Sequence, residues 1–498
     1  MLAPDFDTFV ALSRQGDLVP VWRELLFDTD TAVTAYAKLA RPPFGFLLES
    51  VVGGEKWARW SFLGTSPRGA WRLDPGGRVR RWTPGGGWDE GVVREGPLAD
   101  LDRELRSLRP VTVPGLPRFP GGAVGYLGYD VVRYVERLPD APPDPLGLPA
   151  ALMVVPDVVL AIDNLFRRAR AIAQVDVRGA EGDRAELRRR YEEAGGKLAD
   201  VVTTLRDGHA PGPLELTPGG GEPAFESSFT RAGFEEGVRR IKEYILAGDA
   251  FQVVLSQRLR VPLRAAPLDL YRALRSLNPS PYLFYLELED LRLVGSSPEV
   301  LVRTEEGRVI VRPIAGTRPR GGTDEEDERL SIELLADEKE RAEHLMLVDL
   351  GRNDVGRVAR FGSVRVSDYM SIERYSHVLH MVSQVEGELR EGLSAMDVFR
   401  ACFPAGTVSG APKVRAMEIL DELEPVRRGP YAGAVGHFAY GGASMDTAIA
   451  IRTLFTHGDS AYVQAGAGIV ADSDPAREYE ETLAKARALL RVLGMVPS

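Results

Sequence analysis

The residues with the clearest chemical potential in this sequence are two glutamates at helical spacing, Glu340 and Glu343, within the acidic segment Ala336–Asp354. Side chains three residues apart share one face of an α-helix. That face continues into Leu347 and Leu350, which favour burial, so we expect it to turn toward the interior. Carboxylates on an inward face need a cation, because an unpaired buried charge is costly.

A second segment, Pro475–Leu490, repeats this arrangement near the end of the chain. Glu478, Glu481 and Lys485 follow one another at intervals of three and four residues, so a helix places them on one face. Two acidic helix faces in one chain predict a divalent-metal site.

Other candidate residues lie on predicted strands or in the loops between them. Glu299 follows a Ser-Ser-Pro break, where partial burial would raise its pKa and favour a general acid, although a solvated glutamate also fits. Gln252 alternates with aliphatic residues of a predicted strand and projects from the opposite face. His380 lies in an apolar strand, where a core histidine is the ordinary alternative. The Gly-rich loop around Thr407 offers free N–H groups and a hydroxyl, which could cradle a carboxylate or phosphate.

The last part of the chain predicts three consecutive strands. On the second strand Arg452 shares a face with Ala448 and Ala450, and Gly466 and Gly468 leave similar space on the third. A pocket floored by small residues with one fixed guanidinium suits a small planar anion. The alternative is tight packing of two sheets, with Arg452 in an ordinary ion pair.

Four further polar residues allow two interpretations each. Glu49 and Ser50 lie in an otherwise apolar strand, where polar groups must be paired or bind something; the simpler interpretation is an edge strand with a solvated Glu49. Arg318 and Arg320 could bind anions, or could pair with Asp324 and Glu325.

Composition bounds the class of protein. The chain has 498 residues, 44% hydrophobic and 27% charged, with net charge −10, which indicates a soluble globular protein of roughly two to four domains. The acidic balance argues against a nucleic-acid partner. Without a signal-peptide pattern or a run near the ~18 apolar residues of a membrane span, we expect a cytoplasmic protein. Cys402 is the single cysteine, so an intrachain disulfide and a thiolate metal cluster are excluded.

The pattern along the chain predicts two regions. Helical periodicity covers Asp5–Leu25 and is followed by strands. The Pro- and Gly-rich stretch 207–226 is typical of a linker. It separates an N-terminal regulatory or structural region, residues 1–206, from the main region, residues 227–498.

These segments together carry a family resemblance. The motifs FLLES, GYLGYD, GDAFQVVLSQR, NPSPYLFY, RPIAGTRPRG, ERAEHLMLVDLGRND, PAGTVSGAPKVRAM, AIRTLF, QAGAGIV and EYEETLAKARAL occur in one order over nearly the full length. The chain resembles anthranilate synthase component I, of the chorismate-utilising enzymes. The resemblance implies an α+β fold, with two stacked antiparallel β-sheets forming a sandwich, helices on the outside and an active site between the sheets.

The resemblance also implies a reaction and a cofactor. Chorismate would be aminated at C2 by ammonia with loss of its C4 hydroxyl, and the intermediate would eliminate pyruvate to give anthranilate. Mg²⁺ would be required, and it suits oxygen ligands with retained waters. Glu343 and Glu481 match the positions that contact the metal, and Glu340 and Glu478 match those that hold its waters.

Further site residues follow from the same resemblance. Glu299 matches the acid that protonates the departing hydroxyl, and Thr407 and His380 match positions near the ring and C4. The positions that match substrate-binding residues are Tyr431, Arg452, Gly466, Gly468 and Lys485. The positions that match an allosteric tryptophan site are Glu49, Ser50, Pro281, Tyr282 and Leu283.

Two positions separate branches of the family. Aminodeoxychorismate synthases usually have a lysine where this chain has Ala315, and isochorismate synthases use a lysine as base where it has Gln252. A lysine at either place would supply a nucleophile or a base. External ammonia is therefore the nucleophile that fits, which favours anthranilate synthase over aminodeoxychorismate synthase component I of the folate pathway. A non-catalytic regulatory relative would have no physical reason to keep mutually repelling carboxylates on inward faces.

Ammonia implies a source. The sole cysteine lies in CFPAG rather than in a glutaminase motif, so a separate glutamine amidotransferase subunit is the expected partner. The resemblance implies a heterotetramer of two large and two small subunits, inhibited by L-tryptophan.

Overall fold

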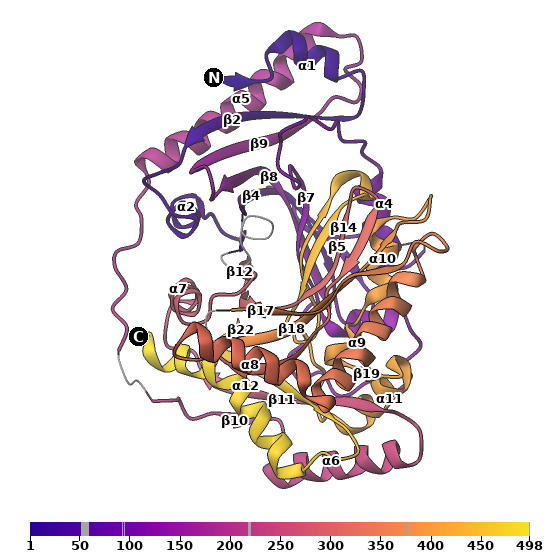
Figure 1. Cartoon of the computed structure of the whole chain (residues 1–498). Coiled ribbons are helices and arrows are strands. Elements are labelled where there is room, and N and C mark those ends of the chain that lie inside the picture. Colours follow the sequence, from indigo (N-terminus) through magenta and orange to yellow (C-terminus); the bar gives the residue numbers. More distant parts are fainter. Residues whose placement is uncertain (51–58, 92, 94, 218–220, 376–377, 498) are drawn as a thin grey trace.

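The computed structural model describes residues 1–50, 59–91, 93, 95–217, 221–375 and 378–497, which Figure 1 shows in their arrangement. Helices and strands are mixed along the chain, as the α+β prediction requires. In this part of the chain the α-helices are α1 (Phe6–Leu12), α2 (Ala32–Leu39), α4 (Pro97–Arg106), α5 (Arg184–Asp207), α6 (Arg231–Leu246), α7 (Pro267–Leu277), α8 (Asp324–Ala336), α9 (Glu338–Gly356), α10 (Ala395–Cys402), α11 (Lys413–Leu423) and α12 (Pro475–Met495).

The strands form one hydrogen-bonded antiparallel network with two branches. The first branch runs in the order β2 (Leu18–Leu26), β9 (Arg168–Asp176), β8 (Ala151–Asp163), β4 (Trp60–Leu73), β3 (Phe44–Glu49), β12 (Tyr282–Leu288), β13 (Leu291–Ser297), β22 (Thr453–His457), β23 (Ser460–Ile469) and β11 (Gln252–Pro262). The short strands β1 (Leu2–Ala3), β10 (Glu226–Ser227) and β19 (Gly410–Ala411) add to its two ends.

The second branch starts again from β8. It continues through β7 (Gly122–Leu127), β20 (Ala434–Ala439), β21 (Met445–Ile449), β14 (Val300–Glu305), β15 (Arg308–Val311) and β18 (Val378–Glu388), with β16 (Ile314–Pro319) and β17 (Arg365–Arg374) also paired to β18. The strands β5 (Val79–Thr83) and β6 (Gly87–Glu90) extend from β4.

The two branches meet in the long pair β4 and β8. One end of β4 pairs with β3 and its other end with β5, and the register of β4 against β8 shifts between Pro67 and Gly69. The two ends of β8 likewise pair with β7 and β9. Both strands therefore belong to both branches, and a hydrophobic cluster that includes Phe46, Phe284, Tyr126 and Val435 joins strands of one branch to strands of the other.

The predicted continuous strand through Arg452 is wrong. The chain forms two strands there, β21 in the second branch and β22 in the first, and Arg452 lies between them with φ +50°. Because β21 pairs with β14 while β22 pairs with β13, the chain changes branch at this point. Arg452 therefore does not share a strand face with Ala448 and Ala450.

Helices cover the strands that carry the candidate residues. Contacts join α9 to β16 and β18, α11 to β11, and α12 to β23 and α6, and Figure 1 shows α6 and α12 together at the bottom of the view. The acidic segment begins its helix at Glu338, because the Asp337 side chain accepts hydrogen bonds from the backbone N–H groups of Lys339 and Glu340. None of the helices in the described ranges is long and apolar enough to cross a membrane.

The predicted helix over Asp5–Leu25 ends early. The helix α1 stops at Leu12, and Leu18–Leu26 forms strand β2, which pairs along its whole length with β9. The apolar residues Leu18, Val19 and Val21 are fully buried in this pairing, so tertiary contacts decide the conformation of the second half of the segment.

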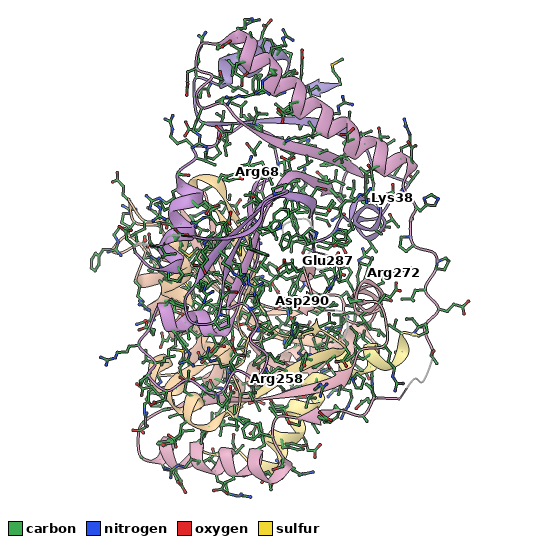
Figure 2. The ribbon with its side chains drawn as sticks, turned by 180° about the vertical axis from the view of Figure 1, so that it is seen from behind. Lys38, Arg68, Arg258, Arg272, Glu287 and Asp290 are labelled. Carbon is green, nitrogen blue, oxygen red and sulfur yellow. The ribbon has the colours of Figure 1, made fainter. Side chains whose placement is uncertain are left out.

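The stretch 208–217, part of the predicted linker, has no helix or strand and runs between α5 and the main region. Just before this stretch, Lys38 donates to Leu205 O of α5 at 2.9 Å, and within it Gly212 O accepts from Arg272 at 2.6 Å. Figure 2 shows both side chains on the side of the molecule that this stretch follows.

Strands β3 and β7 pair with β12 and β20, so strands from both sides of the linker share one network. The division into two regions stays a prediction.

Candidate active site

Strands β11 and β23 bring Gln252 next to the first acidic helix. Gln252 is buried, and its Nε2 donates to Glu343 Oε1 at 3.4 Å. In the neighbouring strand, a Cβ on Gly468 would lie 2.6 Å from Gln252 Nε2. Glycine at position 468 therefore leaves the space that the Gln252 amide occupies.

The second acidic helix reaches the same strand through Lys485. Its Nζ donates to Gly466 O at 3.0 Å and lies 2.7 Å from Glu481 Oε1. A Cβ on Gly466 would lie 2.8 Å from the Tyr431 hydroxyl, so this glycine allows Tyr431 to approach the strand. Tyr431, Gly466 and Lys485, three of the five positions that the resemblance implies for substrate binding, are therefore in proximity.

The carboxylates of the two acidic helices are unequally placed. Glu343 is half-buried, and its pKa is raised by desolvation and by the charge of Glu340, while Lys485 acts in the opposite direction. Desolvation also raises the pKa of Glu478, with a further contribution from Glu481. Lys485 of α12 thus acts on Glu343 of α9, so the two acidic helices lie near each other at this point.

Basic residues of the chain partner two of these carboxylates. Arg318 donates to Glu340 at 3.4 Å and also to Asp337 at 2.7 Å and Glu333 at 3.1 Å. Arg320 pairs with Asp327. Both arginines therefore pair with carboxylates, but the predicted partners Asp324 and Glu325 are wrong, because the fold brings other acidic side chains closer. No group of three or more His, Cys, Asp or Glu side chains that could hold a metal ion occurs among the described residues. The metal site stays a prediction.

The donor set nevertheless fits a hard divalent cation. The candidate ligands are all carboxylate oxygens, which Mg²⁺ prefers. Desolvation and the charge of Glu340 raise the pKa of Glu343, and Lys485, Lys339 and the long hydrogen bond from Gln252 offset only part of this rise. A cation placed near Glu343 would remove this penalty.

Glu299 is the buried carboxyl of the site. It lies between β13 and β14, is 7% exposed, and burial raises its pKa to about 8. Thr407 Oγ1 donates to Glu299 Oε2 at 3.3 Å, which brings the Gly-rich loop to this carboxyl. The side chain is therefore protonated at neutral pH and can act as a general acid, and the expected burial is confirmed.

His380 is held by backbone at one ring nitrogen. Its Nδ1 lies 3.1 Å from Gly316 O and 3.1 Å from Thr317 Oγ1. Because a carbonyl oxygen can only accept, Nδ1 carries the proton and Nε2 is left as an acceptor. Burial lowers the pKa of His380, so the ring is neutral.

Arg452 carries a partly buried guanidinium at the change of branch. Desolvation lowers its pKa, and its charge is close enough to act on both His380 and Tyr431. Within the described ranges, no carboxylate forms an ion pair with Arg452, so the predicted alternative of an ordinary ion pair is wrong. An unpaired, partly buried guanidinium is a site for an anion.

The five residues predicted for an allosteric site also come together. Leu283 on β12 stands directly opposite Glu49 on β3. Glu49 is buried and accepts hydrogen bonds from the Tyr271 hydroxyl at 2.6 Å and from Arg275 at 2.9 and 3.1 Å, which rules out a solvated edge residue. Among the described residues, the Ser50 hydroxyl has no hydrogen-bond partner. A cavity of about 1130 Å³ is lined by Glu49, Ser50, Pro281, Tyr282 and Leu283, among others.

Sequence reasoning missed several partners of the predicted residues. The residues that hold Glu49, Tyr271 and Arg275, are four apart on α7, a spacing that could have drawn attention to one helical face. Arg428, which lies 5.6 Å from the Tyr431 ring centroid, had no obvious signal in the sequence.

The chain belongs to the chorismate binding enzyme family, whose sequence pattern matches residues 61–491. Among its relatives, anthranilate synthase component 1 of Pseudomonas putida is 52% identical over 494 residues, which cover 98% of each chain. Anthranilate synthase component 1 of Thermus thermophilus is 50% identical over 481 residues, covering 96% of this chain and 98% of the relative.

Solved structures agree with this assignment. Anthranilate synthase component I from Streptococcus pneumoniae matches 94% of this chain and 99% of its own with a TM-score of 0.76 and 36% identity. The menaquinone-specific isochorismate synthase MenF from Escherichia coli matches 98% of both chains with a TM-score of 0.69 and 18% identity, which shows a shared fold. The resemblance drawn from the sequence motifs is confirmed.

Proposed function

We propose that this chain is the chorismate-converting component of an anthranilate synthase, which forms anthranilate and pyruvate from chorismate and ammonia. The observation that carries the proposal is about 50% identity over nearly the whole length to relatives of that name. The site supports it, because Gln252 and the buried Ala315 stand where related enzymes use lysine. Neither side chain can act as nucleophile or base, so ammonia has to enter from outside.

In this proposal Glu299 is the general acid. Its protonated carboxyl gives a proton to the C4 hydroxyl as the carbon–oxygen bond breaks, and the hydroxyl leaves as water. Thr407 holds Glu299 Oε2 in place. The neutral His380 offers its Nε2 as a hydrogen-bond acceptor near the substrate ring. Arg452 binds the enolpyruvyl carboxylate, which supplies the negative charge that the guanidinium lacks.

We also propose that Mg²⁺ is the cofactor. Glu343 and Glu481 would bind it directly, and Glu340 and Glu478 would bind its waters. Bound there, it would supply positive charge for the ring carboxylate of the substrate. Arg318 and Lys485 now balance Glu340 and Glu481, so metal binding would replace these partners.

Assembly and regulation complete the proposal. Ammonia comes from a glutamine amidotransferase subunit, in a heterotetramer of two large and two small subunits. L-Tryptophan inhibits by binding the cavity beside Glu49 and Ser50. The two strand branches pack as a sandwich around the site, which their shared hydrophobic cluster supports.

The test is direct. Purified protein with Mg²⁺, chorismate and an ammonium salt should yield fluorescent anthranilate. A product that retains the enolpyruvyl side chain would instead indicate an aminodeoxychorismate synthase, and no turnover with ammonium would reject both.

A further inference from the structure

One buried arginine connects two segments that carry candidate catalytic residues. The Arg428 side chain is 2% exposed. One of its terminal nitrogens, Nη1, donates to Val408 O at 2.6 Å, and the other, Nη2, donates to Val254 O at 2.7 Å. Val408 follows Thr407 directly, and Val254 is two residues after Gln252. A single guanidinium therefore fixes the Thr407 turn against strand β11.

Glu424 holds this arginine in place from four residues before it. Arg428 Nε donates to Glu424 Oε2 at 2.8 Å, and Arg428 Nη2 donates to Glu424 Oε1 at 2.7 Å. Glu424 Oε1 also accepts from the backbone N–H of Ser256 at 2.9 Å and from its hydroxyl at 2.7 Å. The carboxylate thus ties Arg428 to β11 a second time, and Gln464 of β23 donates to the same Ser256 hydroxyl.

The arginine also contacts a third part of the site. Its Cζ lies 5.6 Å from the ring centroid of Tyr431, in the arrangement of a cation–π contact. Tyr431 is the residue whose hydroxyl approaches Gly466. Three segments that the substrate would contact in the proposed reaction therefore meet at one buried side chain.

We propose that Arg428, held by Glu424, is a positioning residue for the reaction. It fixes the positions of the Thr407 turn, strand β11 and Tyr431 relative to one another. This inference rests on the proposed function, since it assigns the consequence to chorismate turnover. Arginine suits the task because its planar guanidinium donates in several fixed directions, whereas lysine offers a compact point charge. A displacement of about 1 Å in a positioned group can cost about 100-fold in rate.

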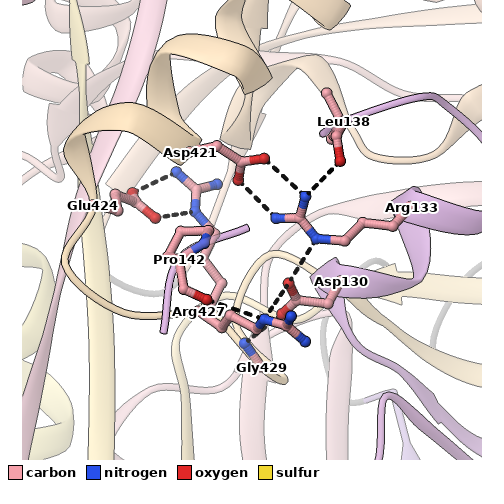
Figure 3. Close-up of polar contacts among 9 residues, drawn as sticks. Asp130, Arg133, Leu138, Pro142, Asp421, Glu424, Arg427 and Gly429 are labelled. Carbon is pink, nitrogen blue, oxygen red and sulfur yellow. Dashed lines mark hydrogen bonds and ion pairs between the residues drawn. The ribbon is translucent and has the colours of Figure 1, made fainter. Parts of the chain in front are cut away.

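A second ion pair, made by Asp421 of α11 just before Glu424, supplies a matched control. Arg133 donates to Asp421 at 2.7 and 2.8 Å, and Asp421 lies three residues before Glu424. Figure 3 shows Arg133 approaching Asp421 while Glu424 lies on the other side of this cluster. The other contacts of Arg133 are Asp130 and Leu138 O, which are not candidate site residues. This pair therefore also joins a guanidinium to a carboxylate, but Arg133 itself donates to none of the three segments; its one link toward them is Asp130, which accepts from the Gly429 N–H at 3.3 Å.

The experiment compares R428K, R428M and R133K with the wild type. We expect R428K to lower kcat for anthranilate formation about 100-fold with a smaller change in the KM for chorismate. R428M should lower kcat further, so that lysine restores part of it. R133K should lose a similar amount in thermal midpoint but keep its kcat near the wild-type value.

Equal kcat values for R428K and R133K would overturn the positioning role. If R428K does not fold, the double variant E424L/R428M replaces the pair by apolar side chains, which proteins often tolerate. A folded double variant with wild-type kcat would also overturn the role, and a folded variant with depressed kcat would support it. The wild type in the same assay separates the two claims, because its failure to form anthranilate rejects the proposed function itself.

Discussion

Thr407 Oγ1 donates a hydrogen bond of 3.3 Å to Glu299 Oε2, although 108 residues separate the two in the chain. Glu299 is the carboxyl whose pKa burial raises to about 8, and Thr407 belongs to the turn that Arg428 fixes. Thr407 thus positions Glu299, the general acid of the proposed reaction, and burial keeps its carboxyl protonated.

The first prediction concerns this acid. E299Q removes the proton donor but keeps the shape of the side chain, so we expect kcat to fall by about 10²–10⁴-fold. Anthranilate fluorescence under saturating ammonium measures the effect. E306Q, at an exposed residue of the turn between β14 and β15, should keep full activity. An E299Q protein that turns over as fast as E306Q would remove Glu299 from the chemistry.

The pH profile tests the same group independently. Since the acid must be protonated, kcat/KM should fall as pH rises through about 8, the raised pKa of Glu299. Glu299 also makes the free energy of unfolding depend on pH. Between its ordinary pKa of 4.5 and the raised value of about 8, the folded state holds a proton that the unfolded state releases. The free energy of unfolding therefore falls as pH rises through this window. Thermal unfolding across the window should show the loss in the wild type and less of it in E299Q. Identical slopes in both proteins would contradict the assignment.

Removal of one metal carboxylate is the third prediction. E481Q should abolish anthranilate formation and weaken Mg²⁺ binding in calorimetry, with the fold preserved. The matched control is E480Q, because Glu480 is the adjacent exposed residue and pairs with Arg231 instead. Mg²⁺ affinity that is the same in both variants would take Glu481 out of the metal shell.

The fourth prediction addresses regulation. Ser50 has a buried hydroxyl that lines the cavity of about 1130 Å³, so S50F should fill part of this space and S50A should remove one polar group. Both variants should need more L-tryptophan for half-inhibition, with catalysis in its absence retained. Inhibition curves that coincide with the wild type in both cases would place the effector elsewhere.

The parts of the site that sequence could predict are those set by local spacing. Glu478, Glu481 and Lys485 follow helical intervals, and α12 forms across all three. Glu299 stands at a break between strands, and its burial follows from that position. Such features depend on neighbours within a few residues, so a single sequence contains the necessary information.

The parts that sequence could not predict depend on distant partners. The residues before and after Arg452 look like one strand, and only pairing with β13 and β14 divides them. The second half of Asp5–Leu25 has helical spacing but pairs with β9. Arg318 meets Glu340 across two elements. In each case tertiary contacts chose among conformations that were locally acceptable.

The most direct measurement is identification of the product by mass, from chorismate, Mg²⁺ and either an ammonium salt or glutamine with an added glutaminase subunit. We expect anthranilate and pyruvate in equal amounts with ammonium alone, and with glutamine only when the glutaminase subunit is present. Isochorismate, or an aminated product that keeps its enolpyruvyl group, would show that the protein is not an anthranilate synthase.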